Sequence, residues 1–315
     1  MTQVKDIDRK QVKKKPSPLK EALEGVVDCI KFVLRNRYGI TGVVILSAFI
    51  IIALFPWLFT PYTPDQDFRR EIIAMGGEVP YPPTPDHPLG IDQRGRDIWA
   101  RVVYGTRVSL TAGILVALIA TIIGVLVGSI AGYVRGKLDA LLTLLSDVIM
   151  MIPSLLLILL AITLFREIWS IWHTIALIAI ISWPSTARAT RALTMQLASS
   201  GYVDAAKALG ASGKRIITRH ILPQVLPLAF ARAAVLIAGA IVTVASLSFL
   251  IPQASGRADW GAVISDAFAN WSYVTDQGMW LWFIVPGLFI ALTVIGFICL
   301  GEALSEYFNP RLRKR

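Results

Sequence analysis

Six apolar segments constrain this chain more than any other feature of its sequence. A transmembrane helix needs about 20 apolar residues, because a helix rises 1.5 Å per residue through a hydrocarbon layer of roughly 30 Å. The segments run approximately from Gly39 to Phe59, Leu110 to Tyr133, Leu141 to Phe165, Ile168 to Pro184, Leu226 to Leu250 and Gly278 to Gly301. With 55% hydrophobic and only 17% charged residues, the 315-residue chain is too apolar for a soluble domain. The sequence therefore predicts an all-α membrane protein with six transmembrane helices.

Two segments carry further expectations. The first apolar run begins near Gly39, far later than in a signal peptide, and no small-residue cleavage site follows it, so an uncleaved first span is expected. The fourth segment is short, and Pro184 is expected to kink a helix that continues out of the membrane. Kinks are also expected at Pro153 and Pro286.

The distribution of lysine and arginine predicts the orientation. Residues 1–37 hold ten of them, and together with residues 135–137, 188–219 and the end of the chain they hold 22, against eight in the other three connections. Cytoplasmic loops carry the excess of positive charge. Both termini and the 188–223 connection are therefore expected in the cytoplasm. The expected layout is a basic tail over 1–38, a first helix over 39–59, an outer loop over 60–107, a five-helix core over 108–301 and a C-terminal tail over 302–315.

The remaining composition argues against several classes of function. The net charge is +10, but the basic residues lie between apolar runs, where they set the orientation of the protein in the membrane and do not indicate nucleic-acid binding. Cys29 and Cys299 lie near opposite ends and suggest neither a disulfide nor a metal site. The three histidines have no metal-ligand spacing, and no catalytic set can be assembled. We expect a non-catalytic protein without a cofactor of its own.

The stretch YVDAAKALGASGKRIITRHILP, over 202–223, contains GASGK, which resembles a phosphate-binding loop only superficially. A Walker loop needs G-xxxx-G-K-[ST], and here Lys214 is followed by Arg215, while Ala208 stands where the first glycine is needed. The stretch also follows no strand. It is not expected to bind ATP.

Instead, the stretch predicts two short helices. VDAAKALG contains good helix formers and ends at Gly210, a natural C-cap, while Ser212 is placed to cap a second helix that stops before Pro223. The small residues Ala205, Ala206 and Ala208 leave a face that another protein can approach closely. This is the pattern of a docking element.

These residues resemble the EAA loop of ABC importer permeases, whose pattern is E-A-A-xxx-G, nine residues, then I-x-L-P. Asp204, Ala205, Ala206 and Gly210 match the first half, and His220, Ile221, Leu222 and Pro223 match the second, with Asp204 replacing Glu and His220 replacing Ile. The resemblance implies that the residues coupling to the ATPase are Asp204, Ala205, Ala206, Lys207, Ala208, Leu209, Gly210, His220, Leu222 and Pro223.

The resemblance extends over most of the chain, from about Asn36 to Arg315, and RHILP is the form typical of the dipeptide, oligopeptide and nickel branch. HPLGIDQRGRDIWARVVYGTRVSL, ASLSFL and the terminal NPRLR are similar to their counterparts in that branch. The tail before Leu34 is unusually long and lysine-rich, and IPQASGRADWG lacks the glycine-rich LG that often follows SFL.

The resemblance implies a MetI-like permease fold in the cell membrane. It implies a similar permease as partner, two cytoplasmic ATPases that bind ATP and magnesium, and an external solute-binding protein. ATPase closure is expected to move the helix from Asp204 to Leu209 and, through helices four and five, to switch the access of the pathway. Peptides are the branch's commonest cargo, with oligosaccharides and nickel as alternatives.

Three further sets of residues carry expectations. Gly124, Gly128 and Gly132 form a G-xxx-G-xxx-G stripe that predicts close helix packing. Asp147 and Arg232 are charges inside predicted spans, for which a structural pair or snorkelling is favoured over contact with cargo. The external segments 80–96 and 251–277, with Trp260, Trp271 and Tyr273, are expected to meet the binding protein.

Two other classes of function remain as alternatives, an ion channel and an intramembrane enzyme. An ion channel would need no ATPase, and the two-helix cytoplasmic loop has no purpose in that reading. An intramembrane enzyme would need convergent polar residues inside the spans, which offer few beyond Asp147 and Arg232.

Overall fold

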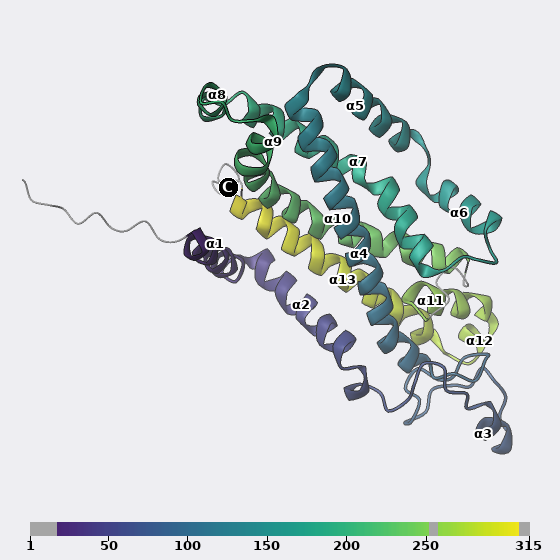
Figure 1. The fold of residues 1–315 in the computed structure, drawn as a ribbon. Coiled ribbons are helices and arrows are strands. Elements are labelled where there is room, and N and C mark those ends of the chain that lie inside the picture. The colour runs from purple at the N-terminus through teal and green to yellow at the C-terminus, as the bar shows by residue number, and fades with distance from the viewer. Residues whose placement is uncertain (1–17, 252–257, 309–315) are drawn as a thin grey trace, which may run out of the picture.

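The computed structural model of the protein describes residues 18–251 and 258–308 (Figure 1). These residues form helices and loops, with no strand among them beyond isolated bridges in the 67–97 region. The elements are α1 (Pro18–Val33), α2 (Arg37–Leu54), the 3-10 turn η1 (Pro56–Leu58), α3 (Arg69–Ala74), α4 (Ile98–Val134), α5 (Gly136–Met151), α6 (Ser154–Leu164), α7 (Ile171–Ala198), α8 (Gly201–Ala208), α9 (Gly213–Ile216), the π-helical turn η2 (Ile217–Ile221), α10 (Leu222–Leu250), α11 (Trp260–Ala269), α12 (Trp271–Asp276) and α13 (Trp280–Phe308).

The long helices run side by side between two ends of the molecule. Figure 1 shows α8 and the last turns of α13 at one end, here the α8 end, while α3 and α12 lie at the other, here the α3 end. α4 contacts α2, α5, α7 and α10, and α13 packs between α2 and α10. The helix that enters from the long loop is therefore the central one of the bundle.

Four helices of the described chain are long and apolar enough to cross a membrane, or five if the bent pair α5 and α6 counts as one span. They are Arg37–Leu54, Ile98–Val134, Gly213–Leu250 and Trp280–Phe308. The expected fourth span corresponds to α7, which is helical throughout but is not one of these four helices. An all-helical, multi-pass membrane protein is confirmed, and the count of six spans stays a prediction.

The predicted third span is broken. α5 and α6 meet at a bend of 77°, at the expected proline, Pro153. Proline lacks the N–H of a helical hydrogen bond and moves the preceding residue away from helical backbone. Ile152 accordingly has φ −78° and ψ 125°. The kink expected at Pro153 is therefore confirmed, and it divides the Leu141–Phe165 segment between two helices.

α4 begins well before the expected start at Leu110. Asp97 caps it, accepting a hydrogen bond from the Ala100 N–H at 2.6 Å, and the first turns are buried, with Ile98 and Val102 both at 0% exposure. This first part of α4 is continuous with the span and buried inside the protein, because the long loop and α11 cover it.

The α3 end has an aromatic core. Trp260 of α11 is completely buried, packs edge-on against Phe49 of α2 and Phe289 of α13 at centroid distances of 5.9 Å, and donates its indole N–H to the Val102 carbonyl at 3.1 Å. It joins four helices. Trp260 is therefore unable to contact a binding protein, contrary to its expected surface role, whereas Trp271 is 43% exposed.

Candidate functional site

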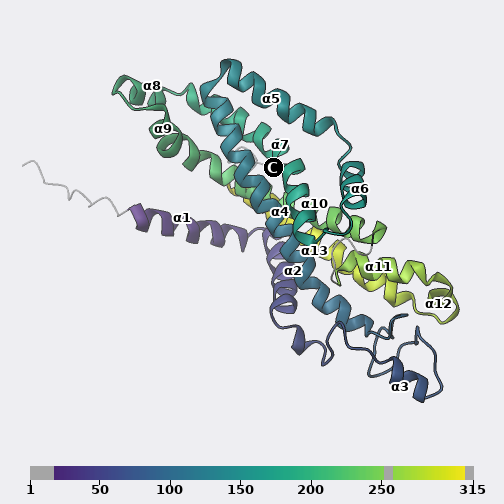
Figure 2. The ribbon, with the colours of Figure 1, turned by 45° about the vertical axis from the view of Figure 1, so that its right-hand side comes forward.

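The candidate site is the connection between α7 and α10, at the α8 end of the molecule. α8 lies beyond the ends of the long helices in both views (Figures 1 and 2). Gly210 follows it with φ +80°, a conformation that glycine adopts without a Cβ penalty. Ser212 then caps α9 by accepting the Arg215 N–H at 3.4 Å. The predicted glycine C-cap and serine N-cap are both confirmed.

α8 is attached on one face and free on the other. Val203 is completely buried and packs in a cluster with Ile216, Ile221 and Val225. Leu209, the residue that directly follows α8, is 89% exposed. The remaining predicted residues of this helix are exposed, apart from a half-buried Ala206: Asp204, Ala205, Lys207 and Ala208. A large apolar side chain held in water beside small alanines suits contact with another protein.

The second predicted helix does not stop before Pro223. α9, η2 and α10 form one continuous helix over Gly213–Leu250, which widens to π geometry over Ile217–Ile221. Pro223 follows the π-helical turn, where the regular i→i−4 hydrogen-bond pattern is already interrupted, so its missing N–H does not end the helix. The 202–223 stretch thus leads directly into the candidate span Gly213–Leu250.

Polar and ring contacts connect α8 to both neighbouring helices, α7 and the helix that contains η2 and α10. The Lys207 ammonium donates to the Ala198 carbonyl at the end of α7 at 3.4 Å and pairs with Asp204 at 3.1 Å. The Gln224 amide of α10 donates to the Tyr202 hydroxyl at 2.9 Å, and the His220 ring lies 6.3 Å from the Tyr202 ring. The exposed ion pair contributes little by itself. Together with the buried Val203, these contacts hold α8 against the ends of α7 and α10.

The glycine stripe lies on the α4 face that packs against α7. A Cβ at Gly124 would come within 2.6 Å of the Thr186 Cβ, and one at Gly132 within 2.6 Å of the Arg191 carbonyl oxygen. The Thr190 hydroxyl donates to the Gly124 carbonyl at 3.0 Å. Gly128 is equally crowded by the backbone of α7. In membranes, close backbone approach of this kind replaces the hydrophobic effect between helices.

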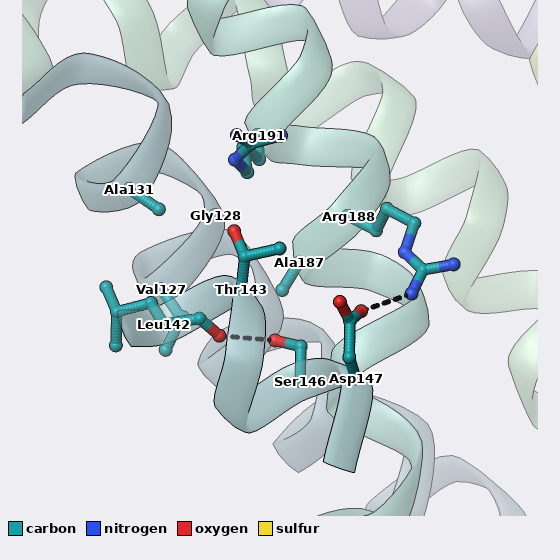
Figure 3. Close-up of a pocket in the computed structure, with 10 residues that line it drawn as sticks. All are labelled: Val127, Gly128, Ala131, Leu142, Thr143, Ser146, Asp147, Ala187, Arg188 and Arg191. Atoms are coloured by element: carbon teal, nitrogen blue, oxygen red, sulfur yellow. Dashed lines mark hydrogen bonds and ion pairs between the residues drawn. The ribbon is translucent and has the colours of Figure 1, made fainter. Parts of the chain in front are cut away.

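Ion pairs join α5 to α7 around a cavity of about 210 Å³ (Figure 3). Asp147 pairs with Arg188 at 2.7 Å, and Asp139 accepts from Arg191 Nη2 at 2.7 Å. Asp147 thus has a partner inside the chain. Arg232, the second predicted intramembrane charge, is exposed on α10 and is not part of this group.

A buried ionic cluster at the α3 end was not predicted. The Arg101 guanidinium, 3% exposed, bridges the carboxylates of Asp92 at 2.8 Å and Asp266 at 2.7 Å, and Arg96 also pairs with Asp92 at 2.7 Å. Beside it the Asp97 carboxyl lies 2.8 Å from His87, and burial raises the pKa of Asp97. The cluster fixes the 87–101 segment against α11. The segment IDQRGRDIWAR contains the acidic and basic residues Asp92, Arg96 and Arg101. No local signal in it indicates that they pair with Asp266.

Several expectations fall partly outside the described residues. They concern the lysine-rich tail over 1–17, the segment 252–257 within the predicted outer loop, and the terminal NPRLR.

Comparisons with known proteins identify the family of the chain. A family model described as "Binding-protein-dependent transport system inner membrane component" matches residues 124–314. The chain is 35% identical over 286 residues to the dipeptide transport system permease protein DppC of Escherichia coli (strain K12), covering 89% of this chain and 91% of the relative.

Two further relatives are similar over the same share of the chain. The oligopeptide transport system permease protein OppC of Bacillus subtilis (strain 168) is 32% identical over 280 residues, covering 89% of this chain and 87% of the relative. The glutathione transport system permease protein GsiD of Shigella flexneri serotype 5b (strain 8401) is 32% identical over 280 residues, covering 89% and 88%.

Proposed function

The chain belongs to the family of inner-membrane components of binding-protein-dependent transport systems, and from this premise we propose that it is a permease subunit of an ATP-driven peptide importer. It is a multi-pass protein of the cell membrane and a non-catalytic subunit, as members of the family are. In the proposed complex it pairs with a similar permease, two cytoplasmic ATPases supply the energy, and an external binding protein delivers the cargo.

The observation that carries this proposal is the exposure of α8. The Leu209 side chain, 89% exposed directly after α8 at the extreme end of the bundle, has no packing role within its own chain. Burying such a side chain against a partner contributes roughly 1.5–3 kcal/mol. We assign the partner as the ATPase pair. An ion channel has no use for such a helix, so that alternative is the weaker one.

The attachments of α8 supply the transmission. When ATP closes the ATPases, the force on α8 passes to α7 through Lys207 and the Ala198 carbonyl, and to α10 through Tyr202 and Gln224. The buried Val203 keeps α8 from sliding over its own support. The switch needs ATP to bind one conformation of the complex better than the other, because a ligand shifts an equilibrium only by its differential affinity.

The topology belongs to the same proposal. We take α7 as the fourth span and the broken pair α5 and α6 as the third, which gives six spans and places α1, α8 and the end of α13 in or near the cytoplasm. Their common position at one end of the bundle supports this assignment (Figure 1), as does the excess of lysine and arginine in the same segments.

Peptides are the cargo that the relatives favour. The three relatives are named for oligopeptides, dipeptides and glutathione, which is itself a short peptide. Oligosaccharides and nickel remain the alternatives, and no group of three potential metal ligands occurs in the part of the chain that the structure describes.

Uptake by reconstituted vesicles tests the proposal. The vesicles contain the permease pair, the ATPases and the binding protein. They should accumulate a labelled dipeptide or oligopeptide only when ATP is supplied on the side of the membrane that carries the ATPases. Unlabelled peptides should compete, and nickel or oligosaccharide should not. Uptake of nickel or oligosaccharide in place of peptide would overturn the cargo, and conduction without nucleotide would overturn the importer itself.

A further inference from the structure

Helix α1 has an apolar face that nothing in the described chain covers. Val26 is 59% exposed, Ile30 52% and Leu34, just after the helix, 49%. These residues recur at intervals of four. Such spacing places them on one side of a helix.

The other faces of α1 have different surroundings. Glu24 and Asp28 are exposed. Because a helix turns by about 100° per residue, Asp28 lies about 160° around the helix from Ile30. A third face meets the protein, where Val33 is 6% exposed and Phe32 packs against Tyr307 at a centroid distance of 5.4 Å. The helix thus separates a protein face, a water face and an uncovered apolar face.

The position of α1 is fixed at its C-terminal end. Asn36 caps α2 and donates its amide to Glu306 of α13 at 2.6 Å, and the Tyr307 hydroxyl donates to the Gly25 carbonyl at 3.4 Å. Figure 2 shows that α1 projects sideways from the bundle, across the direction of α2. A helix that lies across the spans at the end of the bundle lies where the surface of a bilayer would be.

The apolar face continues onto the exposed apolar side of the spanning helix α2. Leu34 leads to Tyr38, 58% exposed, Ile40, 44%, and Val44, 63%, on the outer side of the spanning helix α2. Hydrocarbon next to α2 therefore lies adjacent to the face of α1. An interfacial helix buries such a face at the boundary between headgroups and acyl chains.

Positive charge lies at both ends of α1. Lys31, Arg35 and Arg37 are exposed near its end, and the sequence before it carries Lys10, Lys13, Lys14 and Lys15. Lysine and arginine next to an amphipathic helix are attracted to anionic headgroups. This charge favours a membrane over a protein as the occupant of the apolar face.

We propose that α1 is an interfacial anchor that lies in the membrane surface, with Val26, Ile30 and Leu34 in the acyl boundary and its flanking basic residues on anionic lipid headgroups. The anchor holds the entry to α2 and, through Asn36 and Tyr307, the end of α13. This proposal does not depend on transport activity, so its test is independent of the proposed function.

The experiment measures the depth of a nitroxide label in the full-length chain in lipid nanodiscs. Cys29 and Cys299 are replaced by serine, and a label is attached at Ile30→Cys or, as the matched control, at Asp28→Cys. Discs contain phosphatidylcholine alone or with about 30% phosphatidylglycerol. Collisions with oxygen report lipid contact and collisions with a water-soluble nickel chelate report water.

The label at Ile30 is expected in lipid and the label at Asp28 in water. Each lysine near an anionic surface strengthens the bound state by about fivefold. The variant Lys13→Gln, Lys14→Gln, Lys15→Gln should therefore lower the ratio of lipid-embedded to water-exposed label at Ile30 at least about fivefold in phosphatidylglycerol discs, and leave it unchanged in phosphatidylcholine.

Three results would overturn the proposal. Equal exposure of both labels to the nickel chelate would remove the membrane contact. Protection of Ile30 only after the sister permease or the ATPases are added would make the face a protein interface. Lipid contact of the Ile30 label that changes neither with phosphatidylglycerol nor with the three lysine substitutions would exclude a role of anionic headgroups.

Discussion

Replacing Gly210 by valine is expected to distort the turn after α8 while leaving the packing of the chain unchanged. Gly210 has φ +80°, and a Cβ built there meets no atom within 4 Å, so backbone strain is the only direct effect. For L-residues the left-handed region costs roughly 1–2 kcal/mol, which is about a five- to thirtyfold change in population. A β-branched residue lies at the upper end of this range.

The series Gly210→Asn, Gly210→Ala, Gly210→Val should weaken coupling in that order, because asparagine tolerates positive φ best. The assay is pull-down of the ATPases together with ATP-dependent peptide uptake, with membrane insertion measured for every variant. Gly201→Val is the matched control, since Gly201 also has open space around it and no positive φ. If Gly210→Val bound the ATPases and transported as well as Gly210→Asn, the role assigned to this turn would be refuted.

Three other substitutions test packing, the buried cluster and topology. Gly128→Ala should lower the Tm in detergent, because its Cβ would overlap the backbone of α7, whereas Gly239→Ala, with no atom within 4 Å, should not; equal Tm values would contradict the close approach of the helices. Arg101→Met removes the cation between two buried carboxylates and should cost about 3–5 kcal/mol, seen as a large fall in Tm; wild-type stability would show that the cluster is dispensable. A cysteine at Ser212 should react with an impermeant maleimide only from the cytoplasmic side, and labelling from outside alone would reverse the proposed orientation.

Local signals in the sequence predicted the local features of the site. Gly210 and Ser212 were identified as caps because helix ends leave backbone groups unsatisfied, and few residue types satisfy them. The same reasoning failed at Pro223. A proline ends a helix only where its N–H is needed, and the π-helical turn before it carries α9 into α10 without a break.

Long-range partners had no such signal. Arg101 and Asp266 are 165 positions apart, and nothing in either segment specifies the other. Trp260 was expected at the surface because it lies in a predicted external segment, yet it is buried among three helices and its N–H is satisfied by a carbonyl. The break between α5 and α6 was predictable in position from Pro153 but not in angle, which depends on what α6 packs against.

Photo-crosslinking from Leu209 tests the central assignment most directly. A benzophenone amino acid at Leu209, 89% exposed on the α8 end, is compared with one at Met75, 70% exposed on the α3 end, in membranes that hold the assembled complex. We expect an ATPase adduct from Leu209 and none from Met75. No ATPase adduct from Leu209, or equal adducts from both positions, would contradict the assignment of α8 as the contact through which ATP drives transport.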